Sequence, residues 1–248
     1  MFLSVIIPAY NEEKRIGKTL LAVDHYLTKQ KYDYEIVVVN DGARDRTAEV
    51  VRNFKKMVRG LRLIDNKQNH GKGWVVRQGM LESHGEIRLF MDADNSTTLD
   101  HFDKMWPLFR AGTDVVIGSR DRKDARGARQ AVPQSGFKRF LGNLGNLLIQ
   151  IFAVPGIWDT QCGFKAFTAK AAQAIFAKGR IDRWGFDIEA LALAKKLKLK
   201  IDIIPVYWVN DPQSHVSLKG YLRTFKELFL VWWWLVRDVY GLKRLTKQ

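Results

Sequence analysis

Residues 86–94 read Glu-Ile-Arg-Leu-Phe-Met-Asp-Ala-Asp, and this stretch decides how the rest of the chain is interpreted. The mostly apolar residues 87–91 are typical of a strand buried in a sheet. Asp92 and Asp94 follow where that strand should end, and ligands of open α/β sheets gather at the carboxyl ends of strands. Two such carboxylates can share a hard divalent cation, Mg²⁺ or Mn²⁺, together with substrate phosphate oxygens. The alternative is that Asp94 only caps the next helix.

Strand and helix patterns alternate on both sides of this stretch. Strands are expected at 2–7, 35–39, 61–64, 87–91, 115–118 and 201–206. Helices are expected at 11–27, from about 45, at 71–83, 99–109 and 185–197. This alternation predicts an α/β fold, with a mostly parallel sheet covered by helices on both faces. Residues 158–168 are expected to form a short hairpin or loop around Gly163.

The amino-acid composition limits the class of protein but does not identify its function. The 248 residues, 46% of them hydrophobic, suffice for a sizeable core in one large or two small domains. A single cysteine, Cys162, excludes an intramolecular disulfide and favours a reducing, cytosolic compartment. We expect neither a signal peptide nor a membrane-spanning helix. The net charge of +15 would attract nucleic acid, an anionic membrane or a phosphorylated substrate.

The C-terminal half carries a basic loop and two apolar helical patterns. Residues 119–139 are rich in Arg and Lys, and an amphipathic helix with an apolar stripe over 137–152 is expected after them. A last helix is predicted at 218–242, with its charged side chains confined largely to an arc of about 120°. Its three consecutive tryptophans, 232–234, and the basic tail after it match a helix in the membrane interface. The alternative is a core helix packed on the domain.

Several short motifs together resemble a known family. In order they are Val5-Ile6-Ile7-Pro8-Ala9-Tyr10-Asn11-Glu12, Val38-Val39-Asn40-Asp41-Gly42, Gly71-Lys72-Gly73, Asp92-Ala93-Asp94 and Gly118-Ser119-Arg120. This order is similar to that of family 2 glycosyltransferases. Two later segments, 159–165 and 183–189, resemble the dolichyl-phosphate β-glucosyltransferase branch. The dolichyl-phosphate mannosyltransferase branch matches the N-terminal motifs about as well. The resemblance covers residues 3–235.

The resemblance implies a GT-A fold, a Rossmann-like sheet flanked by helices, and an inverting hexosyl transfer. The donor would be UDP-glucose, with GDP-mannose as the alternative, and the acceptor dolichyl or another polyprenyl phosphate. A Mg²⁺ or Mn²⁺ ion would be held by Asp92 and Asp94. Residues 1–212 would form the catalytic domain, with 119–155 as basic acceptor loop and amphipathic helix. Residues 213–248 would be an interfacial helix and tail, which makes the enzyme peripheral on the cytoplasmic face of the membrane.

The resemblance also assigns a nucleotide-sugar side. Pro8 and Tyr10 could cradle the nucleobase, and Asp41 could accept the imide N–H of the base. Lys72, in a Gly-rich helix start, would favour a diphosphate. The full set of candidates is Pro8, Tyr10, Glu12, Val39, Asp41, Lys72, Asp92, Ala93 and Asp94. Ordinary loop packing, an Asp-Gly turn and a helix cap are the alternatives for Tyr10, Asp41 and Lys72.

The acceptor side is assigned in the same way. Arg120 could hold the acceptor or leaving phosphate by a forked contact, and the alternative is a solvated charge. Asp159 joins Asp92 and Asp94 as a catalytic candidate. Further phosphate-binding candidates are Arg129, His215 and Lys219, and candidates for positioning the sugar are Gln161, Trp184, Asp187 and Glu189. Ion-paired structural roles remain open for the three acidic residues Asp159, Asp187 and Glu189. Because a phosphate monoester is largely ionised at pH 7, a strong general base is less necessary.

Two positions depart from the family pattern, and two other functions compete. Ser96 stands where mannosyltransferase relatives often have a glutamine ligand, and His215 where relatives commonly have lysine. A sugar nucleotidyltransferase would need a Gly-rich basic loop after the first strand, which residues 8–11 do not supply. A nucleic-acid-binding module is not supported by any zinc-finger, RNP or helix-turn-helix signature.

Overall fold

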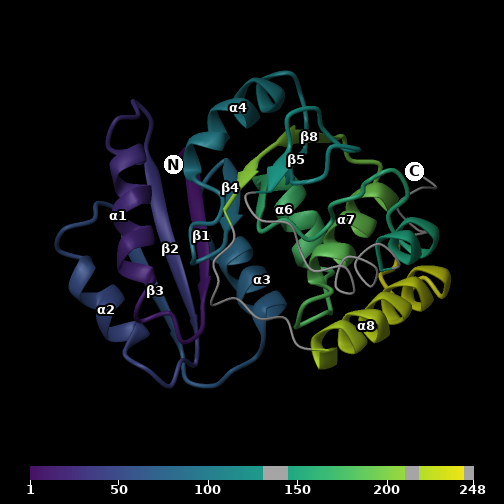
Figure 1. Cartoon of the computed structure of the whole chain (residues 1–248), viewed down its shortest axis with the longest axis horizontal. Coiled ribbons are helices and arrows are strands. Elements are labelled where there is room, and N and C mark those ends of the chain that lie inside the picture. The colour runs from purple at the N-terminus through teal and green to yellow at the C-terminus, as the bar shows by residue number, and fades with distance from the viewer. Residues whose placement is uncertain (131–144, 210–217, 243–248) are drawn as a thin grey trace.

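The computed structural model describes residues 1–130, 145–209 and 218–242, and a single seven-stranded sheet organises them (Figure 1). The strand order is β3-β2-β1-β4-β7-β5-β8, and β7 alone runs antiparallel to its neighbours. The strands are β1 Leu3–Ala9, β2 Tyr34–Asp41, β3 Leu61–Asn66, β4 Ile87–Met91, β5 Val115–Ser119, β7 Phe164–Thr168 and β8 Ile201–Pro205. The predicted α/β class is therefore confirmed.

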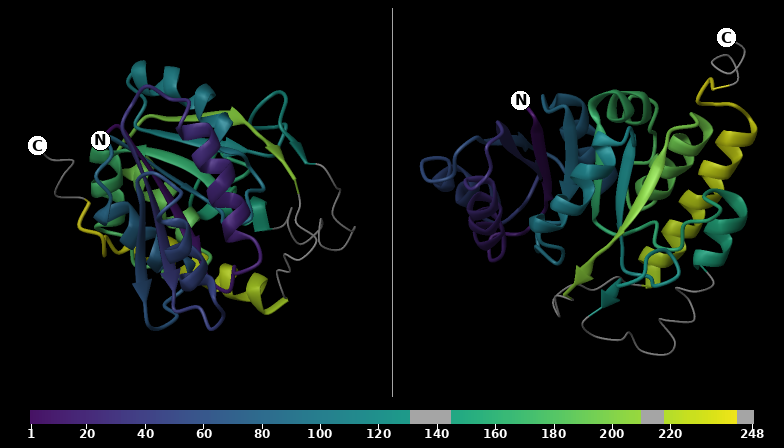
Figure 2. Two further views of the ribbon diagram at one scale, coloured as in Figure 1. Left: turned by 90° about the vertical axis from the view of Figure 1, so that its left-hand side faces the viewer. Right: turned by 90° about the horizontal axis from the view of Figure 1, so that it is seen from above.

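Helices cover both faces of this sheet because neighbouring strand residues point to opposite sides (Figure 2). In β1, Ile6 belongs to one core and Val5 and Ile7 to the other. The first core is completed by α3 Lys72–Glu82, α6 Ala169–Phe176, α7 Phe186–Lys196 and α8 Leu218–Val236. The second is completed by α1 Ile16–Leu27, α2 Thr47–Phe54, the short helix η1 Leu99–His101 and α4 Phe102–Arg110.

The structure corrects the prediction for residues 158–168. Residues 164–168 form β7, which lies inside the sheet between β4 and β5 instead of in a surface loop. Lys165 lies fully buried in this strand, so the apolar pattern that marks the other strands is interrupted. The helix that follows directly, α6, was also absent from the sequence prediction.

Some helix boundaries differ from those expected. Helix α1 begins at Ile16 and not at 11, because Asn11 has a positive φ of 56° and residues 13–15 form a turn before the helix. Helix α8 ends at Val236, six residues before the predicted end at 242. A small parallel pair, β6 Arg129–Gln130 and β9 Tyr207–Trp208, lies beside the main sheet. Residues 131–139 of the basic loop, the start of the amphipathic helix, His215 and the basic tail lie outside the described residues.

The last helix packs on the domain along one side and exposes aromatic side chains along another. Leu228 and Val231 are buried in the core that α7 shares, whereas Phe229 is 58% and Trp233 41% exposed. The helical residues 145–152 lie beside the C-terminal part of α8 (Figures 1 and 2), where the rings of Phe152 and Trp232 are 5.7 Å apart. None of the helices in the described ranges is long and apolar enough to cross a membrane.

Candidate active site

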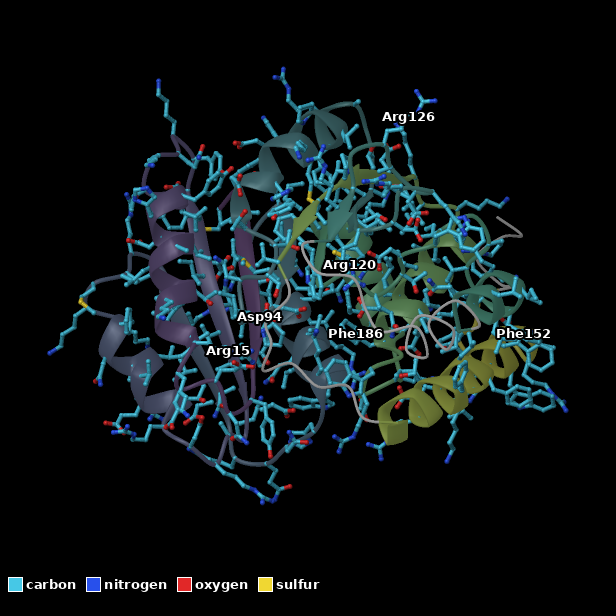
Figure 3. The ribbon with its side chains drawn as sticks, in the orientation of Figure 1. Arg15, Asp94, Arg120, Arg126, Phe152 and Phe186 are labelled. Atoms are coloured by element: carbon cyan, nitrogen blue, oxygen red, sulfur yellow. The ribbon has the colours of Figure 1, made fainter. Side chains whose placement is uncertain are left out.

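The acidic pair lies at the carboxyl end of β4, as the strand pattern predicts (Figure 3). Asp92 donates its backbone N–H to the carbonyl of Gly163 over 3.1 Å, which ties it to the start of β7. Its side-chain Oδ1 lies 2.5 Å from Nζ of Lys72. Asp94 accepts the backbone N–H of Ser96 at Oδ1 over 2.9 Å, and the following helix is not capped by it, since Thr98 holds that position.

Lys72 is the first residue of α3 and brings a cation to the carboxylates. Burial lowers the pKa of Lys72, but the negative charges of Asp92 and Asp187 outweigh burial and raise the pKa above its ordinary value. The side chain therefore stays protonated near neutral pH. The ring of Trp184 lies 5.3 Å from the same ammonium group. A cation next to two carboxylates is suited to binding a diphosphate together with a divalent metal.

Glu12 and Arg15 add a second charged pair near the acidic residues. They lie in the turn after β1 and form an ion pair of 2.7 Å. Burial raises the pKa of Glu12, the charge and hydrogen bond of Arg15 oppose this rise, and the nearby negative charges of Asp94 and Asp92 add to it. Glu12 is among the residues predicted from the sequence, whereas Arg15 is not. The signal was an opposite charge three residues on, at a spacing that brings side chains together in a helical turn.

The other donor-side candidates lie at the ends of β1 and β2. Pro8 and Val39 are buried in the strands and Ala93 is buried after β4, whereas Tyr10 is 39% exposed. The carboxylate of Asp41 accepts three hydrogen bonds from the 69–71 loop, two from the backbone N–H groups of His70 and Gly71 and one from the side chain of Asn69. Asp41 thus fixes the loop that leads into Lys72. Recognition of a nucleobase by Asp41 stays a prediction.

The glycines on either side of Lys72 have a packing role that the sequence did not indicate. A Cβ at Gly71 would lie 2.4 Å from the carbonyl oxygen of Asp182, and one at Gly73 would lie 2.5 Å from that of Ile181. The backbone N–H of Trp74 already donates to Asp182. The glycines therefore admit residues 181–183 against the start of α3, and the backbone N–H of Trp74 at this helix start is used for that contact.

Arg120 and Asp159 form a bidentate ion pair. Nε and Nη2 of Arg120 donate to the two carboxylate oxygens over 2.8 and 2.7 Å, and the backbone N–H of Arg120 adds a third bond. Burial raises the pKa of Asp159, but the charge and hydrogen bonds of Arg120 outweigh it and hold the pKa below its usual range. The Nε and Nη2 groups of Arg120 are therefore paired with Asp159, and the binding of a phosphate by Arg120 stays a prediction. Asp124, missed in the sequence, accepts the N–H groups of Trp158 and Asp159 over 2.7 Å.

The remaining acceptor-side candidates differ in their surroundings. Asp187 forms a buried ion pair of 2.6 Å with Lys165. Glu189 accepts the backbone N–H groups of Arg180 and Ile181 and the hydroxyl of Tyr240, so it supports the loop before α7. Asp187 and Glu189 therefore make contacts that support the fold, which is the alternative to positioning the sugar. Gln161 and Arg129 are exposed. The position of His215 and the side chain of Lys219 fall outside the description.

The sequence matches a known protein family and several named relatives. Residues 4–176 match the family Glycosyl transferase family 2. The dolichyl-phosphate beta-glucosyltransferase of Drosophila melanogaster is 36% identical over an alignment of 263 positions, gaps included, which covers 98% of this chain and 77% of that protein. The human protein of the same name is 34% identical over 247 residues, which cover 92% of this chain and 74% of that protein.

Solved structures show the same architecture. Glucosyl-3-phosphoglycerate synthase from Mycobacterium tuberculosis, in complex with Mn²⁺, UDP-glucose and phosphoglyceric acid, has a TM-score of 0.68 and 16% identity over 93% of this chain and 79% of that chain. Staphylococcus aureus TarS in complex with UDP-GlcNAc has a TM-score of 0.58 and 20% identity over 93% of this chain and 66% of that chain. The fold is therefore the GT-A fold. With the family match over most of the sheet and the relatives along nearly the whole sequence, the chain is a glycosyltransferase and belongs to family 2.

Proposed function

We propose that this glycosyltransferase moves glucose from UDP-glucose onto dolichyl phosphate or a related polyprenyl phosphate. The observation that carries the proposal is the meeting of Asp92, Asp94 and Lys72 at the carboxyl edge of the sheet, where a nucleoside diphosphate would be held. The substrate class is supported by the relatives named dolichyl-phosphate beta-glucosyltransferase, which match at 34–37% identity.

The acidic pair fits a hard divalent cation. Both side chains supply oxygen ligands, and the hydrogen bond described for Asp94 uses only Oδ1. Among the described residues no group of three His, Cys, Asp or Glu side chains is arranged for a metal. Mg²⁺ commonly takes one or two carboxylates and completes its coordination with phosphate oxygens and water. When bound, Mg²⁺ or Mn²⁺ would neutralise charge on the departing nucleoside diphosphate.

The residues of the chain supply orientation and charge. Lys72 would bind the diphosphate, with Asp92 holding its ammonium group in place. The acceptor phosphate, already ionised at pH 7, attacks the anomeric carbon as the bond to UDP breaks, so the configuration inverts. No side chain needs to take a proton from this acceptor. Asp159, held ionised by Arg120, is suited to shaping the acceptor side through that pair.

The same proposal places the enzyme at the cytoplasmic surface of a membrane. A polyprenyl tail stays in the bilayer, so the site has to approach the lipid surface. Exposed apolar side chains gather on α8 and on the helical residues 145–152, among them Phe229, Trp233, Ile151 and Phe152. Aromatic side chains favour the interface, and each nearby basic residue adds about 1 kcal/mol of attraction to anionic lipid.

A transfer assay tests the function directly. Purified protein is incubated with Mn²⁺ and radiolabelled UDP-glucose, GDP-mannose or UDP-N-acetylglucosamine, each paired with dolichyl or undecaprenyl phosphate. We expect a labelled lipid product from UDP-glucose with dolichyl phosphate. Transfer from GDP-mannose alone would establish the mannosyltransferase alternative. Absence of transfer in every pairing, with steeply salt-dependent binding to arbitrary DNA, would favour the nucleic-acid-binding alternative.

A further inference from the structure

The loop before α7 connects the candidate donor site to the rest of the molecule. Trp184 in this loop lies 5.3 Å from Nζ of Lys72. Asp182 anchors the loop on α3, since its carbonyl accepts the N–H of Trp74 over 3.1 Å and its carboxylate pairs with Arg77 over 2.6 Å. At the end of the loop lies Phe186, which Figure 3 labels, and the centre of its ring is 5.6 Å from that of Phe90 in β4. The residue between Trp184 and Phe186 is Gly185.

Helix α8 reaches this loop through one carboxylate. Oε2 of Glu227, which is 9% exposed, accepts the backbone N–H of Gly185 over 2.7 Å. A Cβ at position 185 would lie 2.8 Å from Cβ of Glu227, so a larger residue there would push the helix away. Gly185 has an ordinary φ of −76°, and close approach to α8 is therefore the reason for glycine at this position.

The same helix presents its aromatic side chains outwards. Phe229 and Trp233 are exposed, while Leu228 and Val231 pack in the core. Helix α8 therefore carries both the surface proposed for the bilayer and the carboxylate that holds Gly185. Any movement of α8 against α7 would therefore move Gly185, the residue next to Trp184.

We propose that Glu227 is a positioning residue for the donor site, which holds Gly185 and thereby places Trp184 against Lys72. This inference rests on the proposed function, because it assumes that Lys72 binds the diphosphate of the sugar donor. It adds a physical link between the helix at the membrane surface and the site of transfer.

Two substitutions distinguish the length of the Glu227 side chain from its charge. Glu227→Gln keeps an oxygen at the same distance from Gly185, whereas Glu227→Asp keeps the charge but is one methylene too short. We expect Glu227→Asp to raise the KM for UDP-glucose about tenfold, equivalent to ~1.4 kcal/mol, with the KM for dolichyl phosphate unchanged. Glu227→Gln should stay within about twofold of wild type. Lys226→Gln, an exposed neighbour on the same helix, is the matched control.

A double-variant cycle tests whether Glu227 acts through Trp184. Trp184→Leu alone should raise the KM for UDP-glucose, and adding Glu227→Asp should then have no further effect. Additive effects, a wild-type KM in Glu227→Asp, or equal defects in Glu227→Asp and Glu227→Gln would overturn the proposal. If Glu227→Asp does not fold, Glu227→Ala carries the same expectation.

Calorimetry with UDP and Mn²⁺ keeps this test separate from the proposed function. If the wild type binds UDP but transfers no glucose to the lipid, the proposed function fails, and the comparison of variants continues on the dissociation constant for UDP. A wild type that does not bind UDP would overturn both proposals.

Discussion

The carboxylate of Asp92 lies directly against the α-carbon of Gly163, and a Cβ at that position would be 2.0 Å from Oδ2. The start of β7 thus forms one wall of the acidic site, and Lys72 forms another. This contact explains why residue 163 is glycine although its backbone needs no positive φ.

We expect Gly163→Ala to lower the rate of transfer about a hundredfold, because displacing Asp92 by about 1 Å misplaces both the metal ligand and Lys72. Initial rates and Mn²⁺ titration measure the effect. Gly145→Ala is the control, since a Cβ there meets only the ring of Phe225 at an ordinary 3.7 Å. Wild-type rates in Gly163→Ala would show that the position of Asp92 is not critical.

Asp94→Ala should abolish metal-dependent transfer and leave the fold intact, because the side chain is at the strand end and is not part of the core. Loss of a metal ligand removes several kcal/mol of charge stabilisation, so a fall of at least about a hundredfold is expected. Rates with Mn²⁺ and with EDTA, together with circular dichroism, give the result. Asp100→Ala, at an exposed carboxylate nearby, is the control. Full activity of the wild type in EDTA would contradict the metal assignment.

Asp41→Ala should weaken binding of UDP about ten- to a hundredfold, since hydrogen bonds to a charged group contribute roughly 1.5–3 kcal/mol each. The loss acts through the 69–71 loop and through any contact with the base. Isothermal calorimetry gives the dissociation constant for UDP, and binding of dolichyl phosphate should not change. Asp114→Ala removes a carboxylate that accepts the N–H of Lys200 at another edge of the sheet and serves as control. An unchanged constant for UDP would refute this prediction.

Because of the Arg120–Asp159 pair, the free energy of unfolding should fall at acidic pH. The folded-state pKa of Asp159 is depressed, so its contribution is present above the ordinary pKa of about 3.9 and is lost as pH falls through the folded value. Asp159→Asn leaves a buried Arg120 without its partner and should cost about 3–5 kcal/mol at pH 7. Denaturant unfolding at pH 7 and pH 3 measures the free energy, and the gap between variant and wild type should narrow at pH 3. Asp33→Asn, at an exposed site, should show no such gap at either pH. A constant gap across this range would rule out the ion pair as its source.

Replacing Phe229, Trp232 and Trp233 by serine should release the protein from anionic liposomes and reduce transfer to a long-chain acceptor. These side chains supply aromatic area on the exposed side of α8, and interfacial binding scales with buried apolar area. Liposome sedimentation and thermal unfolding are measured together. Leu21→Ser with Met57→Ser removes exposed apolar side chains elsewhere and is the control. If the triple variant unfolds, or sediments like the wild type, the helix belongs to the core and not to the interface.

The parts of the fold that follow a local pattern could be predicted from the sequence. The strand 87–91 and the acidic residues after it are found as expected, because a short, mostly apolar run and a strand end are local signals. Strand β7 could not be predicted, since its buried Lys165 is neutralised by Asp187, 22 residues further on. Arg120 likewise finds its partner 39 residues away. Contacts at that separation decide whether a charge binds a ligand or supports the fold, and neither spacing nor periodicity reveals them.

The antiparallel strand has a consequence for how the protein is made. Because β7 lies between β4 and β5, the two parts of the sheet cannot join until residues 164–168 have left the ribosome. Until then the growing chain can pair β1 to β4 with one another, but the backbone of β4 stays unpaired on the side that β7 will occupy. An open strand edge of this kind is a template for aggregation. The nascent protein is therefore protected from aggregation only once β7 has paired with β4. A chain truncated after β5 would keep the edge of β4 exposed permanently.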